Sequence, residues 1–156
     1  MRDIKEKNPE RGAALVELAM VLPLLLLILV GIIEFGLLFY NQQVLTNSSR
    51  EGARAAIARS TYNGVVLDAN AIEDIVEDYL GLGKTHTDRR LITFGSDPDP
   101  DVTTNGLGGL YGTDLTVTVE YDHLFLVPAL FSLGASVHLS AQTVMKMERY
   151  IAPTTP

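Results

Sequence analysis

Gly12-Ala13-Ala14-Leu15-Val16-Glu17 opens the stretch that decides the fold, and an apolar run from Leu18 to Ile33 follows it directly. Glu34 then interrupts the apolar character, before Phe35-Gly36-Leu37-Leu38-Phe39-Tyr40 completes the stretch. As a helix, residues 18–40 would extend about 34 Å at ~1.5 Å per residue. The hydrocarbon core of a bilayer is roughly 30 Å thick. The sequence therefore predicts a helix that crosses a membrane.

Two carboxylates and a pair of small residues distinguish this span from an ordinary anchor. Ionisable groups at membrane depth cost about 2.5–3.5 kcal/mol on insertion scales, so Glu17 and Glu34 are candidate functional residues. The small pair Gly12-Ala13 precedes the apolar run, whereas the cleavage site of a secretory signal peptide follows it. Cleavage after Gly12 would remove a polar leader and leave the whole span in the mature protein.

This inverted order resembles the class III prepilins. The chain is similar to the TadE-like minor pilins of tight-adherence (Flp, type IV-like) pilus systems in four stretches: Arg11-Gly12-Ala13-Ala14-Leu15-Val16-Glu17, Leu22-Pro23-Leu24, Ile32-Ile33-Glu34-Phe35-Gly36 and Arg50-Glu51-Gly52-Ala53-Arg54. The resemblance is strong over residues 11–60 and looser at the carboxy-terminal strand. It implies processing between Gly12 and Ala13 by a prepilin peptidase, and assembly roles for Glu17 and Glu34.

The resemblance also implies a structural function. The chain would be a membrane-anchored minor pilin, or pseudopilin, that takes part in assembling such a pilus. Its partners would be the major pilin and other minor pilins, the prepilin peptidase, assembly-platform proteins and membrane lipid. It would cross the bacterial inner membrane once, with its carboxy-terminal domain outside, or become extracellular within the pilus. The alternative is a signal-anchored extracytoplasmic binding protein without a pilus role, in which Gly12 and Glu17 are accidental.

The length of 156 residues allows one domain in addition to the span. We expect a cytoplasmic leader at residues 1–12, a long helix at 13–60 with its span at 18–40, an extracytoplasmic domain at 61–150 and a tail at 151–156. Lys and Arg lie closer to the span on its amino-terminal side, which favours a cytoplasmic leader. Pro9 argues against a long helix in that leader. Pro23 is compatible with a kink or with an adjustment of helix packing.

The remainder predicts an α+β domain with a second, shorter helix and a small antiparallel sheet of about three strands. Asn63-Gly64 marks the break after the long helix, and Asp68 is a plausible N-cap for the second helix. An apolar stripe follows at helical spacing, and Gly81 and Gly83 end the helix. The stripe comprises Ile72, Ile75, Val76, Tyr79 and Leu80.

We expect strands at residues 91–94, 114–123 and 135–148, with a loop from Gly95 to Gly112. In the second strand the side chains of Leu115, Val117, Val119 and Tyr121 alternate with polar ones, which predicts a half-buried strand. The apolar connector Leu124–Leu133 either covers the core or contacts the membrane or another subunit. In the long helix, small residues at Ala53, Ala55, Ala56 and Ala58 would allow close packing.

Several features bear on chemistry, and none indicates an enzyme or a cofactor. The net charge of −7 excludes a basic footprint for nucleic acid, and the chain has no cysteine. His123 and His138 lie near one strand connection with Asp122, but their spacing fixes no metal geometry, so we interpret them as surface histidines. Asp97–Asp101 is either an exposed, stiff turn or a calcium site that departs from the EF-hand pattern. We interpret Arg50, Glu51 and Arg54 as a solvated face.

Overall fold

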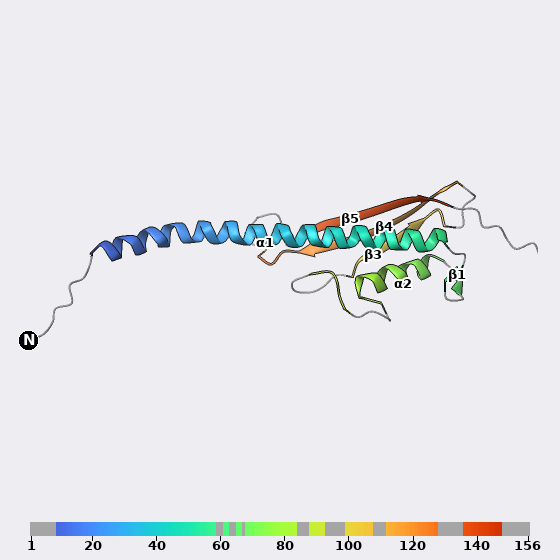
Figure 1. Ribbon diagram of the computed structural model, residues 1–156, viewed down its shortest axis with the longest axis horizontal. Helices are drawn as coiled ribbons and strands as arrows, with labels where there is room; N and C mark the ends of the chain where they lie inside the picture. Colours follow the sequence, from blue (N-terminus) through green and yellow to red (C-terminus); the bar gives the residue numbers. More distant parts are fainter. Residues whose placement is uncertain are drawn as a thin grey trace, which may run out of the picture. The chain divides into compact units, whose positions relative to one another are not determined.

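One helix, α1 (Pro9–Ala58), runs for 50 residues in the computed structural model. The structure describes residues 9–58, 61–62, 65–66, 68–83, 88–92, 99–107, 112–127 and 136–147. The chain divides into two compact units, Met1–Gly36 and Leu37–Pro156, and α1 contributes residues to both. The second unit adds a shorter helix, α2, and a three-stranded antiparallel sheet (Figure 1). The predicted α+β fold is confirmed.

Helix α1 begins at Pro9, four residues before the predicted start. Proline lacks a backbone N–H, but the first turn of a helix leaves its N–H groups without intrahelical partners anyway. Pro9 therefore opens the helix, and the leader before Pro9 lies outside the described residues. The helix also continues through Pro23.

The second half of α1 buries one stripe of side chains in the core of the second unit. Its apolar members are Val44, Leu45, Ala53 and Ala56. Polar members lie on the same stripe, at Asn41, Ser48 and Ser49. The hydroxyl of Ser48 donates to the carbonyl oxygen of Leu45 at 2.8 Å, and Ser49 Oγ lies 2.8 Å from Thr143 Oγ1. The buried serines are thus hydrogen-bonded, as buried polar groups must be to avoid a desolvation cost.

Helix α2 (Ala69–Leu80) matches its prediction at both ends. The Asp68 carboxylate accepts a hydrogen bond from the backbone N–H of Ala71 at 2.8 Å, which satisfies a donor that the first turn leaves open. Gly81 adopts a left-handed conformation, with φ of +78°, and ends the helix. Of the predicted stripe, Ile72, Val76 and Leu80 are fully buried, whereas Ile75 and Tyr79 are half-buried.

The sheet has the order β3-β4-β5, from β3 (Asp101–Asn105), β4 (Asp114–Leu124) and β5 (Ser136–Lys146). Both pairings are antiparallel, and the β4–β5 pairing sets Asp122 opposite His138. The inward side chains of β4 are those that alternation predicted: Leu115, Val117, Val119 and Tyr121 are all buried. Leu139 and Ala141 of β5 join them, and together with the buried stripes of α1 and α2 they form one hydrophobic core.

The first predicted strand is misplaced. Leu91 and Ile92 are not in a strand, and Thr93 and Phe94 lie outside the described residues. The edge strand is instead β3, within the segment that we predicted to be a loop. The prolines of that segment end at Pro100, and Val102, Thr103 and Thr104 follow. Because β-branched residues favour strands and every residue of Asp101–Asn105 has a backbone N–H to donate, the strand forms just after the prolines.

Two further segments either differ from the predictions or are described only in part. A short antiparallel pair, β1 (Thr61–Tyr62) and β2 (Val65–Val66), follows α1 and was not predicted. The apolar connector is described only at its start, where Phe125 is buried and Leu126 is exposed. The rest of the connector, including Leu130 and Phe131, lies outside the described residues, as does Asp97.

Candidate functional site

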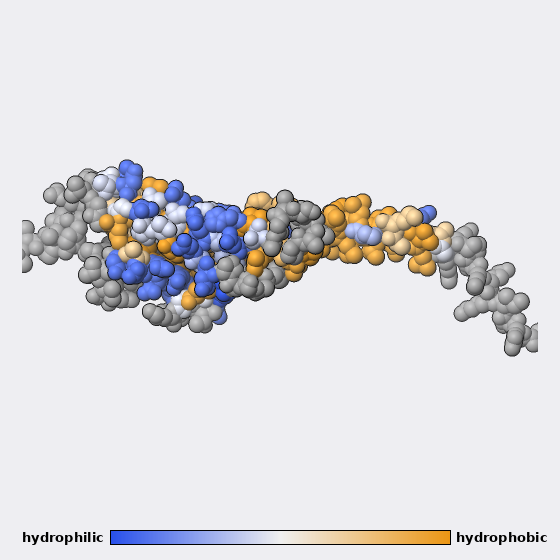
Figure 2. Space-filling view, turned by 180° about the vertical axis from the view of Figure 1, so that it is seen from behind, coloured by the Kyte–Doolittle hydropathy of each residue, from blue (hydrophilic) through white to orange (hydrophobic). Residues whose placement is uncertain are grey.

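The predicted processing site lies near the beginning of α1. Gly12, Ala13 and Glu17 are all exposed, and a Cβ atom built on Gly12 would meet no other atom within 4 Å. Every side chain from residue 12 to residue 29 is exposed as well. Figure 2 shows this apolar surface along the helix, in contrast to the largely hydrophilic surface of the second unit on the face in view. In the described part of the chain, one helix is apolar and long enough to cross a membrane.

Glu34 differs from its neighbours in exposure. Its side chain is 2% exposed, whereas Phe35 is 56% exposed and Ile33 is 45% exposed. The sequence did not predict this burial, because a glutamate within an apolar run carries no sign of which groups surround it. The assembly role that the resemblance implies for Glu34 stays a prediction.

Asn41, the residue directly after the predicted span, joins three segments of the second unit. Its Nδ2 donates to the carbonyl oxygen of Ile92 at 2.7 Å, and its Oδ1 accepts from the backbone N–H of Ile92 at 2.9 Å. Its Nδ2 also lies 3.0 Å from Nδ1 of His123 on β4. Asn41 and His123 are both fully buried. These bonds tie α1 to β4 and to the segment that follows α2.

The two histidines considered for a metal site lie on opposite faces of the sheet. Alternation along β4 turns His123 inward, where it packs edge-to-face against Phe125 with ring centroids 6.0 Å apart. His138 on β5 faces outward. Our interpretation of His123 as a surface residue is therefore wrong, and that of His138 is confirmed. Among the described residues, no group of three or more His, Cys, Asp or Glu side chains is placed to hold a metal ion.

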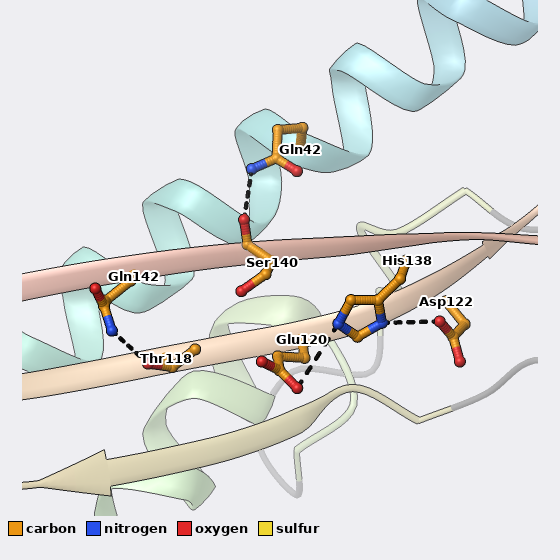
Figure 3. Close-up of polar contacts among 7 residues, drawn as sticks. All are labelled: Gln42, Thr118, Glu120, Asp122, His138, Ser140 and Gln142. Carbon is orange, nitrogen blue, oxygen red and sulfur yellow. Dashed lines mark hydrogen bonds and ion pairs between the residues drawn. The ribbon is translucent and has the colours of Figure 1, made fainter.

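His138 instead belongs to a polar cluster on the outer face of the sheet (Figure 3). Its Nδ1 lies 3.0 Å from the Asp122 carboxylate, and its Nε2 lies 3.7 Å from the Glu120 carboxylate. All three side chains are about half exposed. Behind the sheet, Gln42 of α1 donates to the carbonyl oxygen of Ser140 at 2.9 Å, which holds α1 against β5.

The packing around Gly52 explains why the motif Arg50-Glu51-Gly52-Ala53-Arg54 contains a glycine. A Cβ atom at Gly52 would lie 2.7 Å from Val76 Cγ2 and 3.4 Å from Cγ atoms of Ile72 and Val117. Glycine is thus the residue that lets α1 approach α2 and β4 this closely. The flanking Arg50 and Arg54 are exposed, and Arg54 forms an exposed ion pair with Glu51 at 3.8 Å.

Sequence reasoning overlooked Asn41 and the role of Gly52, although a signal was present. Asn41, Leu45, Ser48 and Gly52 recur at helical spacings of four, three and four residues. A polar or small residue that repeats on the same stripe as buried apolar ones indicates a packed face with its own hydrogen bonds.

One of three comparisons with known proteins gives a match. Residues 12–54 match the family model described as TadE-like protein, a match that lies within α1 and covers less than half of the chain. No curated protein and no solved structure matches the chain. The family match and the membrane-length helix fit a membrane protein associated with a tight-adherence pilus. Residues 12–54 of the chain are thus similar to the TadE-like family.

Proposed function

We propose that this chain is a membrane-anchored minor pilin, or pseudopilin, that takes part in assembling a tight-adherence pilus. The observation that carries the proposal is the order of residues at the start of the matched segment. Gly12 and Ala13 come first, Glu17 follows one helical turn after Ala13, and the exposed apolar helix comes last. This order suits a leader that is removed while the anchor is retained.

In this proposal a prepilin peptidase cleaves between Gly12 and Ala13 on the cytoplasmic side of the inner membrane. The mature chain then begins with the ammonium group of Ala13, and the second unit stays outside. Residues 9–12 are helical in the uncleaved chain, so the peptidase must open the first turn of α1 to reach the bond. Opening costs little there, because the first turn of a helix has few backbone hydrogen bonds to lose.

The exposed span offers the surface for assembly. Within the bilayer it would pack beside the major pilin, other minor pilins and assembly-platform proteins, or against lipid. Glu17 and Glu34 are the residues that we propose to set these contacts. Glu17 is exposed in this chain, and a carboxylate in a low-dielectric region is costly unless it is paired, so Glu17 favours a neighbour that offers a donor or a cation.

The experiment that tests this function is the intact mass and amino-terminal sequence of the protein from its native membranes. We expect the mature chain to begin at Ala13 and to retain the span. Gly12→Leu is expected to abolish processing, because a cleft that fits glycine has no room for a branched side chain. Gly36→Leu is the matched control, since Gly36 is also an exposed glycine of α1 with no atom near its Cβ position.

Processing also separates the minor pilin from a signal-anchored extracytoplasmic binding protein. An intact Met1 in cells that contain the peptidase would count decisively against the pilin proposal. Equal processing of Gly12→Leu and Gly36→Leu would show that Gly12 is not the recognised residue.

A further inference from the structure

The outer face of the sheet carries three carboxylates close to one another. Asp101 of β3 lies directly opposite Glu120 of β4, and Asp122 follows two residues later on the same face. Like charges that face each other across a strand pair destabilise a sheet. His138 contacts Glu120 and Asp122 but is itself exposed. We call Asp101, Glu120 and Asp122 the acidic face.

The complementary charge lies on α1 of the same chain. Arg50 and Arg54 stand one turn apart on the side of α1 that is turned away from the core. The side chain of Arg54 is 72% exposed, and its ion pair with Glu51 at 3.8 Å is long and half exposed. Such a pair contributes little to stability, so Arg54 is available for another partner. We call Arg50 and Arg54 the arginine pair.

We propose that the acidic face of one copy binds the arginine pair of a second copy. The spacings agree: four residues of helix separate Arg50 and Arg54 by about 6 Å, and two residues of strand separate Glu120 and Asp122 by about 6.6 Å. Each guanidinium can therefore meet one carboxylate at the same time. Arginine suits this contact because its planar donors match the two oxygens of a carboxylate.

The contact has to form between copies. Within one chain the core lies between the two surfaces, because α1 buries its opposite side and the sheet buries its inner face. A contact between two different surfaces is heterologous, so each bound copy still offers one free surface of each kind. Copies can then add in one direction without closing into a dimer.

The contact is weak by itself, and the membrane helix compensates for that. Two exposed ion pairs are each worth about 0–1 kcal/mol and are screened by salt. Anchoring confines the copies to one surface and raises their effective concentration, so a weak contact suffices. The proposed contact does not require cleavage at Gly12. A failure of this proposal in cross-linking can therefore be distinguished from a failure of the proposed function, which processing tests.

Cysteine cross-linking tests the contact on the full-length chain, which has no native cysteine. Ser140→Cys places a thiol directly opposite Glu120, and Asn47→Cys places one on α1 a turn before Arg50. The two variants are reconstituted together in phosphatidylcholine vesicles and treated with a short thiol cross-linker. A heterologous contact predicts cross-linked dimers in the mixture and about tenfold fewer with either variant alone. Dimers at equal yield from a single variant would overturn the proposal, because they would indicate a symmetric contact.

Charge reversal identifies the groups that bind. Glu120→Arg with Asp122→Arg in the Ser140→Cys chain is expected to lower the yield about tenfold, since two attractions become repulsions. Arg50→Glu with Arg54→Glu in the Asn47→Cys chain should restore it, because the charges are then exchanged. The matched control is Glu73→Arg with Asp74→Arg on α2, which changes the net charge equally and is expected to leave the yield unchanged.

Three outcomes would contradict the proposal. Equal loss in the α2 control would mean that only the overall charge matters. Failure of the exchanged pair to restore the yield, with circular dichroism showing that both variants are folded, would exclude a direct contact. Cross-linking that requires anionic lipid and is absent with phosphatidylcholine would show that the two copies do not bind each other directly.

Discussion

The side-chain amide nitrogen of Asn41 lies 3.0 Å from Nδ1 of His123, and both residues are fully buried. The same amide group bonds both the N–H and the carbonyl oxygen of Ile92, which fixes its orientation. Because the amide nitrogen is a donor, Nδ1 of His123 must accept, and the histidine is neutral with its proton on Nε2. The hydrogen bond from Asn41 to His123 thus attaches the end of the predicted span to β4, and it requires the His123 tautomer that is protonated on Nε2.

Asn41→Ala should destabilise the second unit. It removes the partners of the Ile92 backbone and of His123 Nδ1, and each buried polar group left without a bond costs about 1–3 kcal/mol. We expect the free energy of unfolding to fall by about 3 kcal/mol. Urea unfolding of the detergent-solubilised full chain, followed by far-ultraviolet circular dichroism, measures this change.

Gln43→Ala is the control for Asn41→Ala, because Gln43 lies on the exposed side of the same helix turn. An exposed substitution of this kind changes stability by no more than about 0.5 kcal/mol. If the two variants unfold at the same urea concentration, the Asn41 bonds do not support the fold.

Gly52→Val should weaken the packing of α1 on α2. The added Cβ would lie 2.7 Å from Val76 Cγ2, and overpacking of this kind costs about 1–3 kcal/mol. Val76→Ala makes room for it, so the double variant should lose less stability than the sum of the two single losses. A coupling of about 1 kcal/mol in a double-mutant cycle is the expected result.

Ala55→Val is the control for Gly52→Val, since Ala55 is half-exposed on the next turn of the same helix. It is expected to show no coupling with Val76→Ala. Strict additivity of Gly52→Val and Val76→Ala would mean that the close approach at Gly52 is not what limits the side chain there.

The sequence predicts most of this fold because its periodicities are local and strong. The alternation along β4 and the stripe and caps of α2 each specify an element without reference to distant residues. The location of the edge strand was harder to predict, because Leu91-Ile92-Thr93-Phe94 is more apolar than β3. β3 owes its position to pairing with β4, in which Val102 faces Val119, and sequence pattern alone does not reveal such a partner.

The residues of the candidate site also differ in how far the sequence alone predicts them. The sequence alone predicts a processing site at Gly12 and Ala13, followed by Glu17, because this prediction depends only on the order of residues along the chain. The inward orientation of His123 follows from the alternation of β4, but its partner Asn41 is 82 residues away in sequence. The burial of Glu34 likewise depends on groups that the apolar run does not specify.

Glu34→Gln tests whether Glu34 contacts other pilus components. The substitution keeps the size of the side chain and removes its ionised form, so membrane insertion should be unchanged. If the carboxylate makes a charged contact within a helix bundle, co-purification with other pilins should fall several-fold. Glu51→Gln, at a half-exposed glutamate of the same helix, is expected to change nothing. Unchanged co-purification and piliation for Glu34→Gln would mean that Glu34 makes no contact on which pilus assembly depends.

Glu17→Ala tests the step on which the proposed mechanism depends. After cleavage, the ammonium of Ala13 and the carboxylate of Glu17 lie one turn apart at the membrane boundary, where an unpaired charge is costly. We expect the carboxylate to pair with the ammonium of an adjacent pilin, because only one axial stagger of the two helices joins the charges. Glu17→Ala should still be inserted, folded and cleaved after Gly12, but it should fail to enter or prime the pilus. Immunoblots of sheared pili and of membrane fractions measure both properties.

The competing explanation for Glu17 is local. The first turn of the mature helix leaves amide donors that the carboxylate can satisfy within its own chain, which would stabilise the subunit without guiding assembly. Glu17→Asp separates the two ideas, because it keeps the charge near the helix end but shortens the reach toward a neighbour. Docking predicts a partial loss of assembly for Glu17→Asp, whereas local pairing predicts nearly normal assembly. If Glu17→Ala assembles at the wild-type level, or fails only because it is not cleaved, Glu17 is a helix-end or peptidase-recognition residue and the docking role is wrong.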